Sequence, residues 1–327
     1  MNTILEPTVA AATAEKSLFV SKRASLDQNR ARQIKIKTIL VPLDFSRASM
    51  DALRYAVAVA RKFAAAVHLL HVTRPDEAAA LGSAHTLRRI AQTVLSAQEG
   101  LTKTHGKRLF PFWPENTHVR TGPAFHEICE QAREIDADLI VIGTRGNTGL
   151  KRVLLGSTAE RVVRFSPCPV LVVHRRRTEE LCIRKILVPT DFSRCAMEGL
   201  MYGAQWAKTF NAKLRLLHVA FPPAPVLNDR VARNLPSERL TVVAEAKCQM
   251  EALTRLDFLR GVGCEQKSLL GYATDTICGE THDADLMVIS THGRTGWRHA
   301  MIGSVAEQVV RYAKCPVLIV PSRCATS

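Results

Sequence analysis

Two glycine-punctuated stretches contain the residue types best suited to binding an anion. Residues 143–158 read GTRGNTGLKRVLLGST, and residues 290–305 read STHGRTGWRHAMIGSV. Glycine lets backbone N–H groups approach a ligand closely, and the start of a helix offers further N–H groups to a phosphate. Each stretch therefore predicts a phosphate site. On spacing alone, the same glycines could instead do no more than shape turns.

Two aspartates and two valines stand at matching places upstream of these stretches. Asp44 follows ILVPL and Asp191 follows ILVPT, while Val72 and Val219 each end the sequence LLHV. A carboxylate can accept hydrogen bonds from ribose hydroxyls or from an adenine amine, and a valine can pack against a base. These residue types predict a nucleoside site beside the phosphate site.

The sequence offers no partner for acid–base chemistry at this site. His71 and His218, which precede the two valines, are interpreted as core or supporting residues rather than as catalysts. Asp44 as a general base would need an activated nucleophile or a metal close by, and the sequence reveals neither. Asp51 and Glu198 fall on the predicted helices that follow the two aspartates, and we interpret them as solvent-facing charges.

A parallel sheet can bring the predicted site residues to one edge. In the first half of the chain, short apolar runs rich in β-branched residues alternate with stretches of helical periodicity. The predicted strands cover 39–41, 67–72, 118–120, 138–143 and 169–173, and the predicted helices cover 47–64, about 83–105, 123–135 and 157–165. This alternation predicts an α/β fold with right-handed crossovers, in which ligands bind beyond the carboxyl ends of the strands. Ser157 is predicted to be the N-cap of the last helix, with Glu160 as its capping-box partner.

The chain contains this unit twice. Residues 37–72 align with residues 184–219, and corresponding residues such as Asp44 and Asp191 are 147 positions apart. Such an internal repeat predicts two copies of one domain, which suits a chain of 327 residues. We predict a flexible arm over residues 1–33, a first domain over 34–176 and a second domain over 183–322.

Composition and charge narrow the class of protein. Apolar residues make up 46% and charged residues 23%, as in soluble globular proteins. Because the N-terminus lacks the pattern of a signal peptide and no apolar run could span a membrane, we predict a cytoplasmic protein without membrane contact. Nine cysteines without a CxxC pair or a zinc-type spacing predict neither disulfides nor a metal site.

The net charge of +15 favours anionic partners such as nucleotides. The basic residues are spread along the chain without an aromatic-interleaved motif, so nucleic acid is not the predicted partner. The sequences GxxxxGK[ST] and GxGxxG are both absent. The predicted phosphate site therefore lacks the lysine-centred signature of a P-loop ATPase.

Taken together, these motifs resemble those of the universal stress protein family, in its ATP-binding branch. The pattern G-x2-G-x9-G-[S/T] is complete in the first copy, and both copies carry ILVPxDFS and LLHV. The resemblance implies two tandem Rossmann-like domains, each a five-stranded parallel sheet of strand order 3-2-1-4-5 flanked by helices. It also implies that the two copies pair through their last strands as an internal pseudo-dimer, and that two chains pair as a homodimer.

The same resemblance implies a site in each copy for ATP or a related adenine nucleotide, with Mg²⁺ as an optional companion. No catalytic residue is implied. Carried over by motif, the implied binding residues are Pro42, Asp44, Val72, Gly143, Gly146, Gly156, Ser157 and Thr158 in the first copy, and Pro189, Thr190, Asp191, Val219, Gly293, Gly303, Ser304 and Val305 in the second.

The function implied is that of a stress-response regulator or sensor. Two alternatives stay open, namely a slow ATP hydrolase and a partner-binding module whose nucleotide pocket is vestigial. The sequence does not name the signalling partner. In the second copy, Ser290 replaces the first glycine of the pattern. If that position needs a positive φ, the serine costs on the order of 1 kcal/mol, which predicts weaker binding by the second copy.

Overall fold

The computed structural model describes residues 34–73, 88, 92, 116–144, 155–174, 182–220, 235–291 and 303–321, and for residues 235–243 it describes the backbone alone. Gly146 and Gly293, the arm over residues 1–33 and nearly all of the helix predicted over 83–105 lie outside the described residues. Those predictions stay predictions.

Ten strands form one sheet in the order β3-β2-β1-β4-β5-β10-β9-β6-β7-β8. Each half of the sheet has the strand order 3-2-1-4-5, so the predicted fold is confirmed. In the first half the strands are β1 (Thr38–Pro42), β2 (Ala66–Thr73), β3 (Thr117–Thr121), β4 (Leu139–Gly143) and β5 (Val170–Val173). In the second half they are β6 (Lys185–Thr190), β7 (Lys213–Ala220), β8 (Cys264–Leu270), β9 (Leu286–Ser290) and β10 (Val317–Val320).

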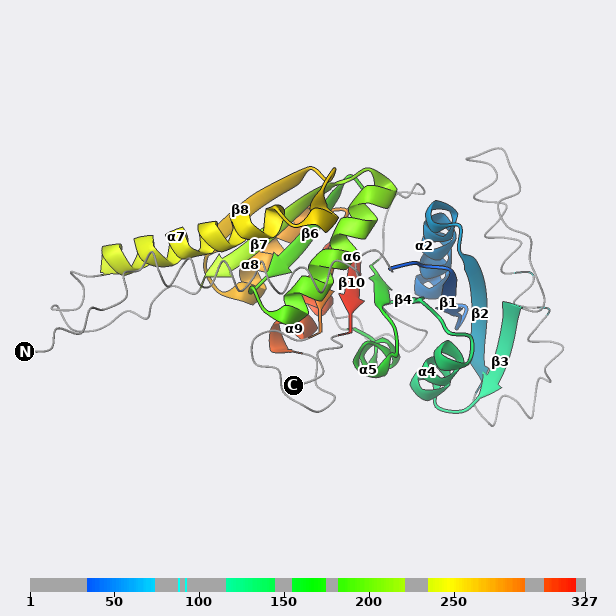
Figure 1. Ribbon diagram of the computed structural model, residues 1–327. Coiled ribbons are helices and arrows are strands. Elements are labelled where there is room, and N and C mark those ends of the chain that lie inside the picture. The colour runs from blue at the N-terminus through cyan, green and yellow to red at the C-terminus, as the bar shows by residue number, and fades with distance from the viewer. Residues whose placement is uncertain are drawn as a thin grey trace, which may run out of the picture.

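The two halves meet at β5 and β10. These strands pair in antiparallel fashion, with Leu171 opposite Leu318, whereas all the pairs within each half are parallel. The halves therefore pair through their last strands as the sequence predicts, and one continuous sheet crosses the molecule (Figure 1). Because the central pair is antiparallel, the carboxyl ends of the strands lie at opposite edges of the sheet in the two halves.

Helices cover both faces of the sheet. α2 (Arg47–Phe63), α6 (Arg194–Phe210) and α7 (Leu235–Thr254) pack on one face, and α4 (Ala124–Glu134), α5 (Ser157–Phe165), α8 (Ala273–Glu280) and α9 (Ser304–Tyr312) on the other. In the first half, Figure 1 shows α2 above the sheet and α4 and α5 below it. Two short 3-10 helices, η2 (Asp257–Leu259) and η3 (Thr281–Asp283), complete the described elements.

The hydrophobic core does not stop at the seam between the halves. Every residue of β4, β5, β9 and β10 is buried, and each face of the sheet carries one cluster of buried side chains drawn from both halves. Phe63 of α2 packs against Trp206 and Phe210 of α6, with ring centroids 5.2 and 6.1 Å apart. Trp206 is fully buried, so the contact between α2 and α6 is part of the core.

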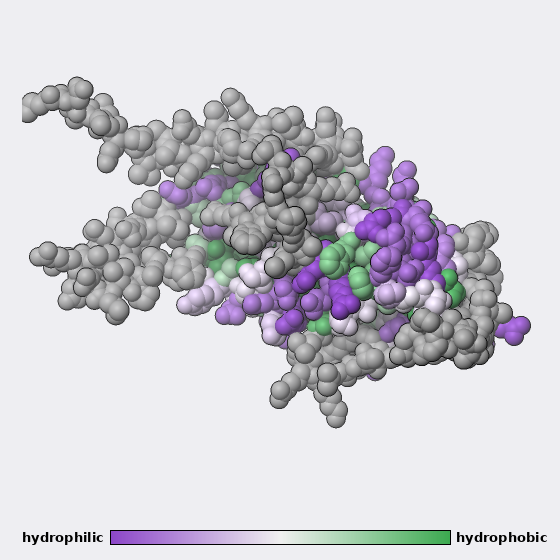
Figure 2. Space-filling view, turned by 90° about the horizontal axis from the view of Figure 1, so that it is seen from below, coloured by the Kyte–Doolittle hydropathy of each residue, from purple (hydrophilic) through white to green (hydrophobic). Residues whose placement is uncertain are grey.

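The face below the sheet in Figure 1 is seen directly in Figure 2. Where the described residues are visible there, hydrophobic areas form small patches between hydrophilic side chains. None of the helices within the described residues is both long enough and apolar enough to cross a membrane.

One prediction about surface charge is wrong. Glu198, predicted to face solvent, is 8% exposed and lines a cavity of about 590 Å³ between the halves. The cavity wall includes Asp138 and Pro169 from the first half, beside the starts of β4 and β5. The helical periodicity of one copy cannot reveal this surface, because the pairing of the halves creates it. Asp51, the counterpart of Glu198 in the first half, is half-buried, and its carboxylate pairs with Arg54 at 3.0 Å.

Candidate functional site

A tight turn follows the first strand of each half and fixes the predicted aspartate. Oδ1 of Asp44 accepts a hydrogen bond from the backbone N–H of Ser46 at 3.0 Å, and Oδ1 of Asp191 accepts one from Ser193 at 3.0 Å. Each serine is in turn the N-cap of the helix that follows, α2 or α6. The carboxylates are therefore held at the carboxyl edge of the sheet by the start of a helix.

The residue after each aspartate has an unusual backbone conformation. Phe45 has a φ of 61° and Phe192 a φ of 63°, which places both in the left-handed region. For a residue with a bulky side chain, this conformation costs about 1–2 kcal/mol. Strain at the same position of both halves marks a turn that the surrounding structure enforces. Sequence pattern does not reveal this conformation, because glycine or asparagine is the usual residue in the left-handed region.

The two histidines of the LLHV motifs brace these turns. Nδ1 of His71 lies 2.6 Å from the carbonyl oxygen of Leu43, and Nδ1 of His218 lies 2.9 Å from that of Thr190. A carbonyl can only accept, so Nδ1 carries the proton in both. The supporting role that the sequence predicts for His71 and His218 agrees with these contacts.

The last glycine of each stretch starts a helix, and here the predicted capping is wrong. Gly156, not Ser157, is the N-cap of α5, and Gly303 is likewise the N-cap of α9. The N–H of Gly156 donates to the carbonyl of Thr144 at 2.7 Å, and that of Gly303 donates to Thr291 at 2.8 Å. Because this link to the strand end fixes the glycine in the extended cap conformation, the following serine becomes the first helical residue. Ser157 and Ser304 are exposed there.

The first glycine of the pattern is required for packing rather than for a positive φ. Gly143 is outside the left-handed region, but a Cβ atom there would lie 2.5 Å from the carbonyl oxygen of Ala48 in α2. In the second half, the buried Ser290 faces Gly199 of α6, whose added Cβ would lie 3.4 Å from the serine nitrogen. The premise that Ser290 strains the backbone is therefore wrong.

The second half contains a cavity of about 300 Å³ at the carboxyl edge of its strands. Its walls also include residues that the motif comparison missed, among them Ile277 of α8 and Thr291 after β9. Thr291 directly follows a predicted strand, which is a signal that sequence reasoning could have used. Of the residues predicted for this half, the cavity is lined by Pro189, Thr190, Asp191, Val219, Gly303, Ser304 and Val305.

In the first half, the predicted residues lie at the equivalent edge. Pro42 ends β1, Val72 lies near the end of β2, Gly143 ends β4, and Gly156, Ser157 and Thr158 begin α5. The strands β2, β1 and β4 are neighbours in the sheet. The fold therefore brings the described part of the predicted set to one edge.

The cavity of the second half combines two kinds of wall. Leu217, Val219 and Ile289 give it an apolar side, while Asp191 and Ser304 give it a carboxylate and a hydroxyl at a helix start. An apolar wall suits a flat base, and the helix start with its exposed hydroxyl suits a phosphate. Among the described residues, no three His, Cys, Asp or Glu side chains gather as a metal site.

The model of the universal stress protein family matches residues 35–174 and 183–321. The chain belongs to this family. The universal stress protein MJ0531 of Methanocaldococcus jannaschii is 37% identical over 146 residues, which is 44% of this chain and 85% of that protein. A universal stress protein of Mycolicibacterium smegmatis is 26% identical over 308 residues, which is 87% of this chain and 97% of that protein.

A solved structure supports the tandem fold of this universal stress protein. The crystal structure of a universal stress protein from Archaeoglobus fulgidus covers 88% of this chain and 97% of its own, with a TM-score of 0.55 and 20% identity. At that identity the likeness concerns the fold alone.

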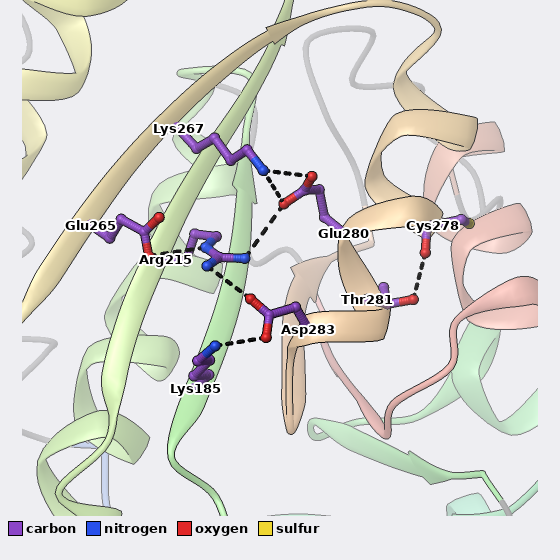
Figure 3. Close-up of polar contacts among 8 residues, drawn as sticks. All are labelled: Lys185, Arg215, Glu265, Lys267, Cys278, Glu280, Thr281 and Asp283. Carbon is purple, nitrogen blue, oxygen red and sulfur yellow. Dashed lines mark hydrogen bonds and ion pairs between the residues drawn. The ribbon is translucent and has the colours of Figure 1, made fainter.

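Opposite the cavity, at the amino ends of the strands, the second half of this universal stress protein carries an ion-pair network (Figure 3). Arg215 contacts Glu265 at 3.1 Å, Glu280 at 3.5 Å and Asp283 at 3.1 Å. Lys185 also pairs with Asp283, at 2.6 Å, and its hydrogen bond together with that of Arg215 lowers the pKa of this carboxyl. The network ties β6, β7 and β8 to α8 and η3.

The first half has histidines in the equivalent place. Nδ1 of His68 and Nε2 of His118 lie 3.2 Å apart, and the two rings are nearly parallel. Burial lowers the pKa of both histidines, and the neighbouring histidine lowers that of His68 further. Arg120, which also lowers the pKa of His118, is itself held by Glu134 and by Gln131 at 2.7 Å.

Proposed function

We propose that each half of this universal stress protein binds an adenine nucleotide, ATP in the first place. The observation that carries the proposal is the cavity of the second half, whose walls contain seven of the eight residues predicted for that site. The eighth, Gly293, lies outside the described residues. Because these seven residues come from three separate segments of the chain, chance proximity is a poor explanation of their convergence on one cavity.

Each type of residue at the site suits a different part of the nucleotide. In the second half, Val219 would pack against the base, and Asp191 would accept hydrogen bonds from the ribose hydroxyls or the adenine amine. Gly303 and Ser304 would present backbone N–H groups and a hydroxyl to the phosphates at the start of α9. Asp44, Val72, Gly156 and Ser157 would do the same in the first half.

A companion Mg²⁺ would be held mainly by the nucleotide. Magnesium commonly binds substrate phosphates together with one or two carboxylates and keeps several waters. Among the described residues at the site, Asp191 or Asp44 is the carboxylate that could take part. Such an ion would neutralise phosphate charge, and it would not require a dedicated protein cage.

The proposal extends from binding to regulation. A site with a phosphate cradle and without an evident base suits a protein that responds to nucleotide, so we propose a cytoplasmic stress-response regulator or sensor. We also propose that two chains form a homodimer. Light scattering on the purified protein, with and without ATP, tests the dimer directly, and a mass of 36.1 kDa at all concentrations would contradict it.

The binding proposal is tested by denaturing the purified protein and identifying any released nucleotide by mass. ATP is then titrated into the nucleotide-free protein by calorimetry. We expect two sites per chain in the parent, with the second-half site lost in Asp191→Ala and the first-half site lost in Asp44→Ala. Asp257→Ala is a matched control, because Asp257 lies in η2, away from the carboxyl edge.

Two outcomes would contradict the proposal. The first is a protein that neither carries nucleotide nor binds added ATP, which would favour the vestigial pocket. The second is unchanged affinity in both aspartate variants, which would move the ligand away from the predicted residues. Steady release of ADP that stops in Asp44→Ala or Asp191→Ala would instead favour slow ATP hydrolysis.

A further inference from the structure

We infer that His71 and His218 are positioning residues that hold the two aspartate turns in the conformation that binds nucleotide. This inference rests on the proposed nucleotide function and adds two residues outside the predicted binding set, of which His218 is not among the residues that line the second-half cavity. It concerns how Asp44 and Asp191 come to face their sites.

The histidine of the second half contacts the turn on both sides of its aspartate. Its Nδ1–H donates to the carbonyl of Thr190, the residue before Asp191, at 2.9 Å. Its ring packs on Phe192, the residue after Asp191, with the centroids 4.4 Å apart. Because His218 is buried and belongs to β7, it anchors the turn to the neighbouring strand.

The contacts made by His218 hold the turn in a strained backbone conformation. Phe192 is held at a φ of 63°, in a region that a phenylalanine rarely adopts. Without the contact from His218, the phenylalanine could return to an ordinary conformation. The backbone rotation would then move the carboxylate of Asp191, which lines the cavity.

The first half shows the same arrangement independently. Nδ1 of His71 lies 2.6 Å from the carbonyl of Leu43, and the His71 ring lies 4.7 Å from that of Phe45, whose φ is 61°. The two copies differ three residues earlier on the same strands, where His68 corresponds to Arg215. The brace has therefore persisted in both copies while a nearby position on the same strand diverged.

Affinity measurements on the full chain test the inference in the second half. An Asp44→Ala background isolates the second site, and ATP is titrated by calorimetry. We expect His218→Leu to weaken ATP binding about tenfold, which is the usual scale for a lost buried hydrogen bond. His218→Asn, whose side-chain N–H sits where Nδ1–H was, should stay within about threefold of the background.

A second substitution separates positioning from general structure. Phe192→Gly in the His218→Leu protein should recover part of the affinity, because glycine adopts the left-handed conformation without strain. The exposed His282 supplies a matched control, and His282→Leu should leave the affinity unchanged. Equal affinities for the Asp44→Ala background and its His218→Leu variant would overturn the inference. So would an Asn variant as weak as the Leu variant.

A readout without nucleotide keeps this test separate from the proposed function. The backbone N–H of Ser193 donates to Asp191 Oδ1, so its hydrogen exchange reports the turn itself. Exchange should be about tenfold faster in His218→Leu and near the parent rate in His218→Asn. Parent protein that binds no ATP would defeat the nucleotide proposal alone, whereas unchanged Ser193 exchange in His218→Leu would defeat the positioning inference. Nitrogen NMR should also show the His218 proton on Nδ1.

Discussion

The two halves of the molecule agree at the carboxyl ends of their strands and differ at the amino ends. Both have the aspartate turn, the left-handed phenylalanine and the bracing histidine. At the amino ends, the first half has the half-buried pair His68 and His118, and the second has the ion-pair network around Arg215. The duplicated fold has thus kept its candidate chemistry and changed how its outer strands are secured.

A second difference lies where the fourth strand of each half meets the first helix. In the first half the small residue is on the strand, where Gly143 lies against Ala48. In the second half the small residue is on the helix, where Gly199 faces Ser290. The first half therefore requires a glycine at this contact, whereas a side chain at Gly199 would make an ordinary van der Waals contact with Ser290.

The largest effect is expected from placing a side chain at Gly143. Gly143→Ser places a Cβ atom 2.5 Å from a backbone oxygen, so the helix must shift, and we expect a loss of about 1–3 kcal/mol in the free energy of unfolding. Ser290→Gly removes no steric clash and makes a buried strand more flexible in the unfolded chain. It should therefore lower the free energy of unfolding by about 0.5–1 kcal/mol. Urea denaturation of both variants measures the two losses. A Gly143→Ser protein as stable as the parent would show that α2 can move away from β4 without a loss of stability.

The next effect concerns the outer strands. Arg215→Met removes the centre of the ion-pair network and leaves Glu280, whose side chain is 17% exposed, with Lys267 as its remaining partner in the network. We expect a loss of about 1–2 kcal/mol, because a half-satisfied charge cluster is worse than a complete one. His68→Met in the first half should cost less. Thermal unfolding at two salt concentrations tests this contrast, since only the loss in Arg215→Met should shrink with added salt.

Smaller changes in stability are expected from two serines at helix starts, one a cap and the other part of the proposed site. Ser193 caps α6, where its Oγ accepts a hydrogen bond from the Ala196 N–H at 3.1 Å, so Ser193→Ala should cost about 1 kcal/mol. Ser304 is not a cap, and Ser304→Ala should change stability by less than about 0.5 kcal/mol while weakening the proposed binding of ATP. Denaturation and calorimetry on the same two samples separate the roles. A stability loss in Ser304→Ala equal to that of Ser193→Ala would contradict the assignment.

The smallest expected change is a pH dependence confined to the first half. The pKa values of His68 and His118 are lowered in the folded protein, so the unfolded chain binds more protons at mildly acid pH. Their contribution to stability is complete above the ordinary histidine pKa of 6.5 and falls as the pH drops below it. Both histidines are half-exposed, so the change should be modest. The carboxyl of Asp283, with its pKa below 3.8, adds no such dependence in this range.

Hydrogen exchange of β2 and β7 amides at pH 7 and pH 5.5 checks this prediction. Protection should fall more in β2 than in β7, and His68→Gln with His118→Gln should remove the difference. Equal loss in both strands, or a difference that survives the double substitution, would place the pH response elsewhere.

Much of the architecture could be predicted because it depends on local patterns. Every described strand of the first half lies within a residue or so of its predicted range, since buried parallel strands read as short β-branched runs between turn residues. The repeat then carried the same assignment to the second half. The order of the strands came from resemblance rather than from pattern, and it too is correct.

The errors share a physical origin in contacts between distant segments. No local rule places Phe45 in the left-handed region, because the bracing histidine belongs to another strand. The cap of α5 is Gly156 because its N–H reaches back to Thr144, a bond that spacing does not reveal. The role of Gly143 is set by the approach of α2, and the burial of Glu198 by the pairing of the halves.

The antiparallel pairing of β5 with β10 also determines which domain each half pairs with. A subunit that carried a single copy would expose this strand edge and could exchange partners with any relative that shares it. Here the edge is already occupied by a neighbour on the same chain, at an effective concentration that free subunits cannot match. Two unequal domains on one chain are always synthesised in equal amounts and paired with each other. Every molecule therefore contains one domain of each kind, whatever other family members are present around it.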